Sequence, residues 1–468
     1  MEKKLGLTTL TALVLSSMLG AGIFSLPQNM AEVASPAALL IGWAITGTGI
    51  LFLAFALLQL TRIRPDLDGG IFTYAKEGFG ELIGFCSAWG YWICAVIANL
   101  SYLVIVFAAL SFFTDSPGHV VFGEGNTWQA MLGASVLLWI VHGLILRGVQ
   151  TAALINLIAT LAKLIPIGLF ILLATLAFNI DVFKLDFTGI NLGQPVWEQV
   201  KSTMLITLWV FIGIEGAVVV SSRAKHKADV GRATVLAVLM ALCVYLLITL
   251  LSLGVVPRVE LAGMRNPSMS GVMVMLMGPI GEIVIAAGLI VSVCAAYLSW
   301  TIMAAEVPFL AAQHGAFPHA FIHQNHKGAP SSSLWFTNGI IQLSLLLIWL
   351  TGSNYNTLLI IASEMILIPY FLVGAFLLKE AIRRKSIKLG LTAAGASIYG
   401  LWLIYASGLE NLFMSVVLYA PGILVFIYAR YAAVNKKKPL NTTERAIIVL
   451  LFALLAPALW MTLSSGLS

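Results

Sequence analysis

Length, composition and charge place most of this chain in a lipid bilayer. It has 468 residues, of which 60% are hydrophobic and 10% are charged, whereas an ordinary soluble domain carries roughly 25% charged residues. So few charges cannot cover so apolar a surface in water, which excludes a soluble globular domain. The net charge of +6 comes from basic residues scattered over short loops, so it does not indicate a nucleic-acid partner.

Apolar runs separated by charged or Pro/Gly-rich breaks predict thirteen membrane-spanning helices. Each run can cross a hydrocarbon core of about 30 Å at about 1.5 Å per helical residue. Lys3 and Lys4 precede the first run, but no small-residue cleavage site follows, so we expect a retained helix rather than a signal peptide. The alternative for the last run is an interfacial tail. The runs are 8–33, 37–62, 82–113, 127–147, 150–178, 201–222, 231–256, 277–313, 333–351, 355–380, 389–408, 411–434 and 445–464.

The distribution of basic residues supports this count and predicts the orientation. Cytoplasmic loops of membrane proteins carry an excess of Lys and Arg. With the N-terminus inside, 21 of the 26 Lys and Arg residues fall in cytoplasmic segments; Lys163 lies in a helix, and the outer loops hold only Lys184, Lys201, Arg258 and Arg265. We therefore expect a multi-pass protein with a cytoplasmic N-terminus.

The first ten spans divide into two sets of five. Because five is odd, the second set would enter the membrane from the opposite side, which is the inverted-repeat plan of many secondary transporters. We expect a single transporter domain over residues 1–468, with a first repeat at 8–178, a second at 201–380 and additional helices at 389–464.

In that plan the first helix of each repeat is broken near the membrane midplane. Both candidates carry paired glycines at matching positions, Gly20 with Gly22 and Gly213 with Gly216. Glycine makes unwinding easier, although it also serves as a packing residue in intact membrane helices. We expect both helices to be interrupted.

A broken helix exposes N–H groups at one half-helix and C=O groups at the other. An α-amino acid offers a carboxylate to the first and an ammonium to the second. This predicts that the N–H groups around Ala21, Gly22 and Ile23 hold the carboxylate. The carbonyls at Ala21 and near Ile212 would then hold the amino group.

Four ionisable residues lie well inside predicted spans: Lys163, Glu215, Glu306 and Glu364. Each costs at least about 2.5 kcal/mol at a helix centre, so each invites a functional explanation. Three acids and one base favour a cationic substrate or a proton over an anionic cargo. Alternatively, some acids are neutral or capped by hydroxyls and serve only packing, above all Glu306, which lies nearest the cytoplasmic end. Lys163 can stand in for a metal cation or carry a proton, and its alternative is snorkelling to the surface.

Two tryptophans, Trp209 and Trp300, fall near the middle of their helices. There an indole can cover a guanidinium or ammonium by a cation–π contact, or simply pack against a neighbouring helix. Tyr91 and Asn99 are eight positions apart and share one helix face. We find no phosphate loop, dinucleotide fingerprint or metal-binding motif, so neither a cofactor nor a metal is expected.

Three segments resemble a known family. Ser17–Pro27 and Leu208–Glu215 are similar to the first-helix and sixth-helix signatures of the amino acid–polyamine–organocation transporters. Ser299–Thr301 resembles the eighth helix of their arginine/agmatine exchangers. The resemblance covers nearly the whole chain and is greatest to the bacterial arginine/ornithine antiporter branch, which is also similar at Ala362–Met365 and in an additional C-terminal helix.

This resemblance implies an all-α LeuT-type fold, alternating access and one-for-one exchange in a bacterial inner membrane, with a homodimer as the assembly. By position, Trp209 would cover the substrate from the periplasmic side, Trp300 would contact its side chain and Ile212 would offer carbonyl contacts. Glu215 would couple gating to charge. Tyr91, Asn99, Ser363 and Glu364 would complete the pocket.

Two residues depart from the pattern. Ala21 stands where the arginine/agmatine exchangers have a serine, and Lys163 is a feature of proton-coupled relatives. The sequence therefore predicts exchange of basic amino acids, arginine for ornithine first, and leaves two alternatives open: a proton-coupled importer, and another pair such as lysine or histidine with its amine. A channel or receptor without a transport cycle is the rival from another class.

Overall fold

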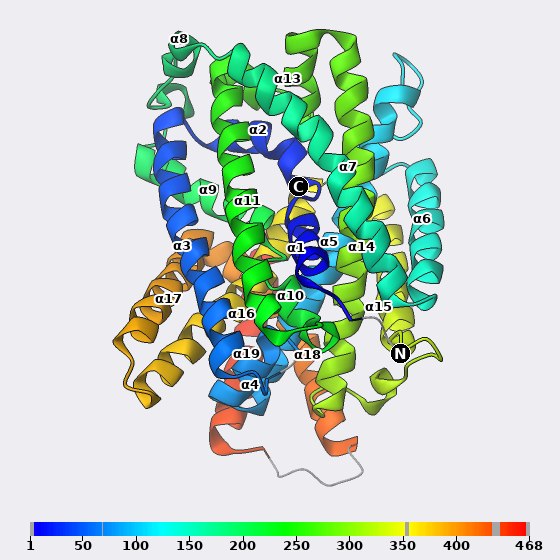
Figure 1. Cartoon of the computed structure of the whole chain (residues 1–468), viewed down its shortest axis with the longest axis vertical. Helices are drawn as coiled ribbons and strands as arrows, with labels where there is room; N and C mark the ends of the chain where they lie inside the picture. The colour runs from blue at the N-terminus through cyan, green and yellow to red at the C-terminus, as the bar shows by residue number, and fades with distance from the viewer. Residues whose placement is uncertain (1–3, 68, 352–354, 433–439, 465–468) are drawn as a thin grey trace.

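Apolar helices make up nearly all of the chain (Figure 1). The computed structural model describes residues 4–67, 69–351, 355–432 and 440–464. Within these ranges the extended structure consists of two isolated bridges. The α-helices are α1 (Leu7–Met18), α2 (Gly22–Val33), α3 (Pro36–Ile63), α4 (Ile71–Phe79), α5 (Glu81–Thr114), α6 (Trp128–Leu146), α7 (Val149–Leu176), α8 (Ile180–Lys184), α9 (Val196–Phe211), α10 (Gly216–Val219), α11 (Lys227–Val255), α12 (Arg258–Ala262), α13 (Ser268–Met277), α14 (Pro279–Gln313), α15 (Ser331–Thr351), α16 (Tyr355–Arg383), α17 (Ile387–Ser407), α18 (Leu409–Ala432) and α19 (Thr442–Ser464). Three short 3₁₀ segments are η1 (Ile190–Leu192), η2 (Ser221–Arg223) and η3 (His319–Ile322).

In the described part of the chain, twelve helical spans are long and apolar enough to cross a membrane. They match the predicted spans except 201–222, where helix α9 stops at Phe211. The last prediction, 445–464, is confirmed as an apolar helix long enough to cross, which packs against α18. The chain is a multi-pass membrane protein.

Local sequence sets several helix ends. Ser35 accepts a hydrogen bond from Ala38 N at 3.3 Å and precedes Pro36, a favourable first helical residue. Thr127 caps α6 in the same way. Between α4 and α5, Gly80 has a φ of +96°, which glycine adopts without strain. This turn lets α4 lie beside the start of α5.

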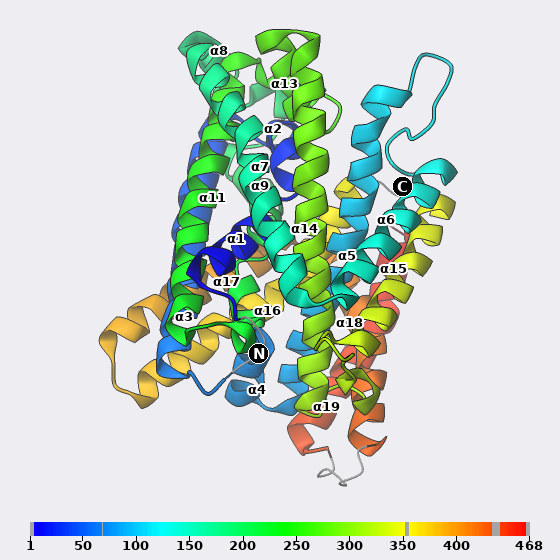
Figure 2. The same ribbon diagram turned by 45° about the vertical axis from the view of Figure 1, so that its right-hand side comes forward.

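The long helices run roughly along one axis, with α1 and α2 one above the other in the interior (Figures 1 and 2). Helix α4 lies at one end of the molecule, and α8 and α13 lie at the other. Helix α14 packs against α5, α7 and α1, and α16 packs between α5 and α17. The two predicted broken helices are thus enclosed by the longest spans.

The beginning of the described chain is paired with the segment after α10. Leu5 N donates to Arg223 O at 2.9 Å, and Lys225 N donates to Leu5 O at 2.7 Å. The Arg223 side chain forms an ion pair with Glu306 of α14 at 3.0 Å. Glu306 therefore pairs with a basic loop residue, whereas the sequence-based alternative expected it to be neutral or capped by hydroxyls.

Candidate functional site

The first predicted break is present between α1 and α2. Helix α1 ends at Met18, α2 begins at Gly22, and residues 19–21 are not helical. Gly20 allows a close approach of α5, because a Cβ there would lie 2.8 Å from the Tyr102 hydroxyl. Ala21 precedes α2 without a side-chain cap. The end of α1 and the start of α2 thus both lie in the protein interior, and the first N–H groups of α2 have no intrahelical acceptor.

An ammonium group from α7 lies at the end of α1. Lys163 Nζ is 3.1 Å from both Ser16 O and Ser16 Oγ and 2.9 Å from Leu19 O. Ser292 Oγ donates to the same Leu19 O at 2.9 Å. A positive charge at a helix C-terminus is favourable. Lys163 is fully buried, so it does not snorkel to the surface.

The second predicted break is also present. Helix α9 ends at Phe211, Ile212 has extended backbone, and Gly213 has a φ of +108°. Ser17 Oγ donates to Gly213 O at 3.1 Å. The two interrupted helices are therefore in contact at their breaks.

Gly213→Ala is expected to destabilise the protein. A positive φ costs a non-glycine residue roughly 1–2 kcal/mol, and an added Cβ would lie 2.5 Å from Ser17 Oγ. We expect a lower thermal midpoint and a lower uptake rate for the purified, reconstituted variant. The matched control is Gly339→Ala, where an added Cβ would meet nothing within 4 Å. Equal stability of the two variants would contradict the strain at residue 213.

Two indoles lie on opposite sides of the first break. Trp300 Nε1 donates to Ser17 O at 3.1 Å, in the last turn of α1. Trp209 covers the first turn of α2, because a Cβ on Gly22 would lie 3.0 Å from Trp209 Nε1. Both tryptophans are buried. The N–H groups of Gly22 and Ile23 begin a helix and have no intrahelical acceptor, so they are available to an anion between the indoles.

The acid Glu215 lies at the second break. It is fully buried, and its Oε2 accepts a hydrogen bond from the Tyr370 hydroxyl of α16. Oε1 has no hydrogen-bond partner among the described residues. Tyr91 also interacts electrostatically with this carboxyl, and its ring stacks on Trp300 at 6.2 Å. Tyr91 and Trp300 therefore lie between Glu215 and the first break.

Tyr91 and Asn99 both face α14, as their spacing predicts. The Tyr91 hydroxyl lies 3.5 Å from Met303 Sδ, and Thr301 Oγ1 lies 3.4 Å from Asn99 Oδ1. Asn99 is fully buried, and its Nδ2 lacks a partner among the residues described. A buried amide with an unused donor is expensive unless a water or ligand satisfies it.

The neighbouring residues Ser363 and Glu364 point in different directions. Ser363 Oγ faces α9, where it lies 3.4 Å from Leu205 O. Glu364 follows about 100° further round the helix, close to the direction of Phe371, which packs on Gly400 of α17. Its two carboxyl oxygens are buried without partners in the described chain. The structure therefore brings Ser363 to the side of α9, the first part of the second broken helix.

Sequence reasoning missed two tyrosines. The Tyr245 hydroxyl lies 2.7 Å from Met18 O and 2.6 Å from Val210 O, so it connects the two broken helices. Nothing distinguishes this tyrosine from other aromatic residues of an apolar helix. Tyr370 could have been found, because it lies seven positions after Ser363 and hence on the same helix face.

The two interrupted spans, their facing breaks and the buried acid are the features of a LeuT-type transporter. A solved structure has the same fold: the crystal structure of MhsT in complex with L-phenylalanine matches with a TM-score of 0.60, covering 86% of this chain and 98% of that chain at 14% identity. At this identity the likeness concerns the fold alone.

The chain belongs to the amino acid permease family, whose sequence pattern matches residues 5–454. An Escherichia coli (strain K12) protein named "Putative arginine/ornithine antiporter" is 73% identical over 461 residues, covering 98% of this chain and 99% of the relative. The "Arginine/ornithine antiporter" of Pseudomonas aeruginosa is 44% identical and covers 92% of each chain. The "Arginine/agmatine antiporter" of Chlamydia trachomatis serovar D is 43% identical, with coverages of 97% and 95%. The family resemblance is confirmed.

Proposed function

We propose that this protein exchanges basic amino acids across a bacterial inner membrane, arginine for ornithine first, by alternating access. The names of the relatives support the substrate class. The observation that carries the proposal is the pair of touching breaks, where two indoles and the buried acid Glu215 lie close to the N–H groups that begin α2. Such a site suits an α-amino acid with a positively charged side chain. Binding and release of this substrate need no covalent chemistry, so we propose a carrier and not an enzyme.

In this proposal the N–H groups of Ala21, Gly22 and Ile23 bind the substrate carboxylate. The carbonyls of Ala21 and Ile212, at the ends of interrupted helices, accept from the amino group. The Ile212 carbonyl is suited to this because extended backbone turns it away from the axis of α9. Ala21 can contribute only its backbone.

The side chains around the breaks have separate roles. Trp209 covers the substrate from the periplasmic side and Trp300 contacts its cationic side chain. Tyr91 and Asn99 shape the pocket, and the free Nδ2 of Asn99 offers a hydrogen bond. Glu215 couples substrate charge to gating through its hydrogen bond with Tyr370.

At the edge of the site, Ser363 contributes a hydroxyl close to α9. Glu364 follows Ser363 in the sequence, and both of its carboxyl oxygens are buried without a partner in the described part of the chain. A cationic side chain of the substrate would supply that partner.

Lys163 acts as a fixed cation that holds the end of α1. Its ammonium is bound by two carbonyls and a hydroxyl, which is the oxygen-rich environment that a metal cation would also take. A resident ammonium favours transport without sodium. The second candidate, a proton-coupled importer, is favoured by the same observation, because a buried amine that releases its proton would loosen α1.

Counterflow separates these candidates. Proteoliposomes loaded with ornithine should take up labelled arginine rapidly without a pH gradient, and empty liposomes with an inward proton gradient should not. Uptake that requires the proton gradient and no internal amino acid would reject exchange, and conductance that never saturates would indicate a channel. Parallel loading with lysine, histidine or agmatine would rank the exchange pairs.

Assembly and topology complete the proposal. We infer a cytoplasmic N-terminus from the excess of basic residues on that side and a homodimer from the family. Residues 8–178 and 201–380 are the two inverted repeats, with residues 389–464 added to them. This division is supported by the equivalent places of the two breaks, one in the first span of each repeat.

A further inference from the structure

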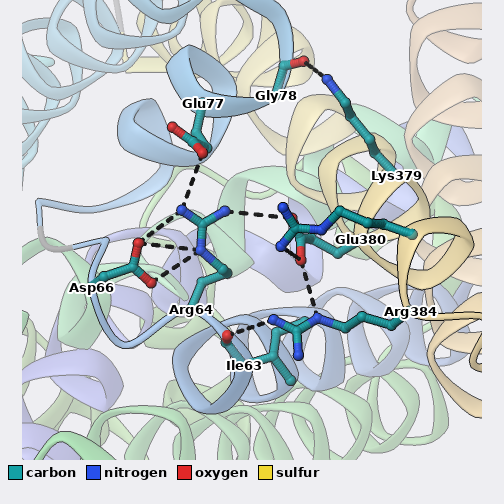
Figure 3. A network of polar contacts seen from close by, with 9 residues as sticks. Ile63, Arg64, Asp66, Glu77, Gly78, Lys379, Glu380 and Arg384 are labelled. Atoms are coloured by element: carbon teal, nitrogen blue, oxygen red, sulfur yellow. Dashed lines mark hydrogen bonds and ion pairs between the residues drawn. The ribbon is translucent and has the colours of Figure 1, made fainter.

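A cluster of charged residues joins the end of α3 to α4 and α16 (Figure 3). The proposed topology places this end of the bundle in the cytoplasm. The centre of the cluster is Arg64, directly after α3. The guanidinium binds Asp66 at 2.8 Å, Glu77 of α4 at 3.1 Å and Glu380 of α16 at 3.4 Å. Through these three carboxylates, Arg64 contacts its own loop, helix α4 and helix α16.

Within the cluster, the pair of Arg64 and Glu380 is the shielded one. Their side chains are 11% and 4% exposed, whereas Asp66 is 59% exposed. Exposed ion pairs contribute little, but removing one partner of a shielded pair leaves an uncompensated charge. The Arg64 hydrogen bond keeps the pKa of Asp66 below its usual value, so this carboxylate stays charged.

Further contacts join the same elements. Arg384 Nη2 donates to Ile63 O at 2.9 Å, and Lys379 Nζ donates to Gly78 O at 2.7 Å. The rings of Tyr74 and Phe376 stack at 5.8 Å. Hydrogen bonds and ring stacking therefore hold the end of α3 and helix α4 against the cytoplasmic end of α16.

The segment from the end of α3 through α4, called here the α3–α4 segment, packs against α10 of the second broken helix. Gly70 packs on α10, since an added Cβ would lie 3.3 Å from Val219 Cα. The crevice that remains between Arg64, Tyr74 and Val218 holds about 10 Å³, room for about one water molecule. A substrate leaving the second break toward the cytoplasm would need this segment to separate from α10.

Helix α16 connects the cluster to the site. It carries Tyr370, which donates to Glu215, and Glu380, which binds Arg64 ten residues further on. A continuous helix of this length transmits a displacement from one end to the other. We propose that the Arg64–Glu380 pair is a cytoplasmic latch, which holds the α3–α4 segment closed under α10 and opens when α16 moves with the Glu215–Tyr370 contact.

This inference rests on the proposed alternating-access cycle, but its test does not require transport. The probe is a Val218→Cys thiol in a chain whose native cysteines are replaced by serine, labelled with an impermeant maleimide from the cytoplasmic side. Val218 is 1% exposed and lines the crevice. Adding Glu380→Gln is expected to raise the labelling rate roughly fivefold or more, the lower range of typical conformational couplings.

The matched control is Arg383→Gln. Arg383 binds the same Glu380 at 2.8 Å but belongs to α16 and is 61% exposed, so its loss removes a partner without detaching α3. Labelling should change less than twofold, and Glu380→Asp should restore part of the slow rate. An unchanged rate in Glu380→Gln, or an equal rise in Arg383→Gln, would overturn the latch.

If Glu380→Gln does not accumulate as folded protein, Arg64→Lys supplies the second test. A lysine keeps the positive charge but loses the planar fork with which Arg64 reaches several carboxylates at once. Labelling of the Val218→Cys thiol should then accelerate, and an unchanged rate would also overturn the proposal. Because labelling is measured without substrate, a failed latch and a failed exchange assay are separate results.

Discussion

Glu215→Gln is expected to lower arginine/ornithine exchange by roughly 100-fold while the protein remains folded. The carboxyl is fully buried and accepts from Tyr370. Hydrogen bonds to a charged group contribute about 1.5–3 kcal/mol, and each 1.36 kcal/mol corresponds to about tenfold in rate. Glutamine keeps the shape but loses the negative charge that faces the cationic substrate. The measurement is initial exchange at equal reconstituted protein, with the thermal midpoint measured in parallel.

Glu198→Gln is the control for this experiment, because Glu198 is 48% exposed and pairs with Lys201 on the surface of α9. Its exchange rate should stay close to that of the parent. Tyr370→Phe should have an intermediate effect, since it removes the hydrogen bond and keeps the carboxyl. Parental turnover in Glu215→Gln would show that the acid is a packing residue and that the site is wrongly placed.

Lys163→Met is expected to abolish measurable exchange and to lower the free energy of unfolding by roughly 2 kcal/mol or more. The ammonium satisfies Ser16 O, Ser16 Oγ and Leu19 O, and each buried group left unsatisfied costs about 1–3 kcal/mol. Ser292 still donates to Leu19 O, which limits the loss there. Exchange and the thermal midpoint of the purified protein measure the two effects.

Lys201→Met provides the comparison, because Lys201 lies near the surface of α9, where it pairs with Glu198 and lies over the ring of Tyr405. It should behave like the parent. A smaller substitution, Lys163→Ala, leaves room for a metal ion, so recovery of exchange in sodium but not in potassium would support the fixed-cation role. A variant of Lys163 that exchanges normally would exclude both the fixed-cation and the proton-carrier roles.

The fold and the two breaks could be predicted because their signals are local. Long apolar runs specify spans, and glycines at equivalent places mark where helix is easiest to interrupt. The span predicted at 201–222 was expected to be interrupted at Gly213 to Gly216, and helix α9 does end at Phe211. Gly213 adopts a φ of +108° and α10 is only a short turn of helix. Hydropathy does not register such a change of direction, because buried non-helical residues are as apolar as helical ones.

Side-chain partners could be predicted only in part. Lys163 was recognisable because an ionisable residue in an apolar run is rare, but its bonds to α1 depend on how helices pack. Ser363 and Glu364 look equivalent in the sequence, yet Ser363 Oγ faces α9, while both carboxyl oxygens of Glu364 are buried without a partner among the described residues. Tyr245 connects the two breaks through a tertiary contact that no local pattern announces.

The backbone pairing of Leu5 with Arg223 and Lys225 prevents α1 and α10 from moving independently of each other. Two backbone hydrogen bonds join the stretch before α1 to the stretch after α10, so the inner halves of both interrupted helices are tied into one rigid unit. A fluorophore placed ahead of Leu5 would consequently report the swing of residues 216–224 as well as its own.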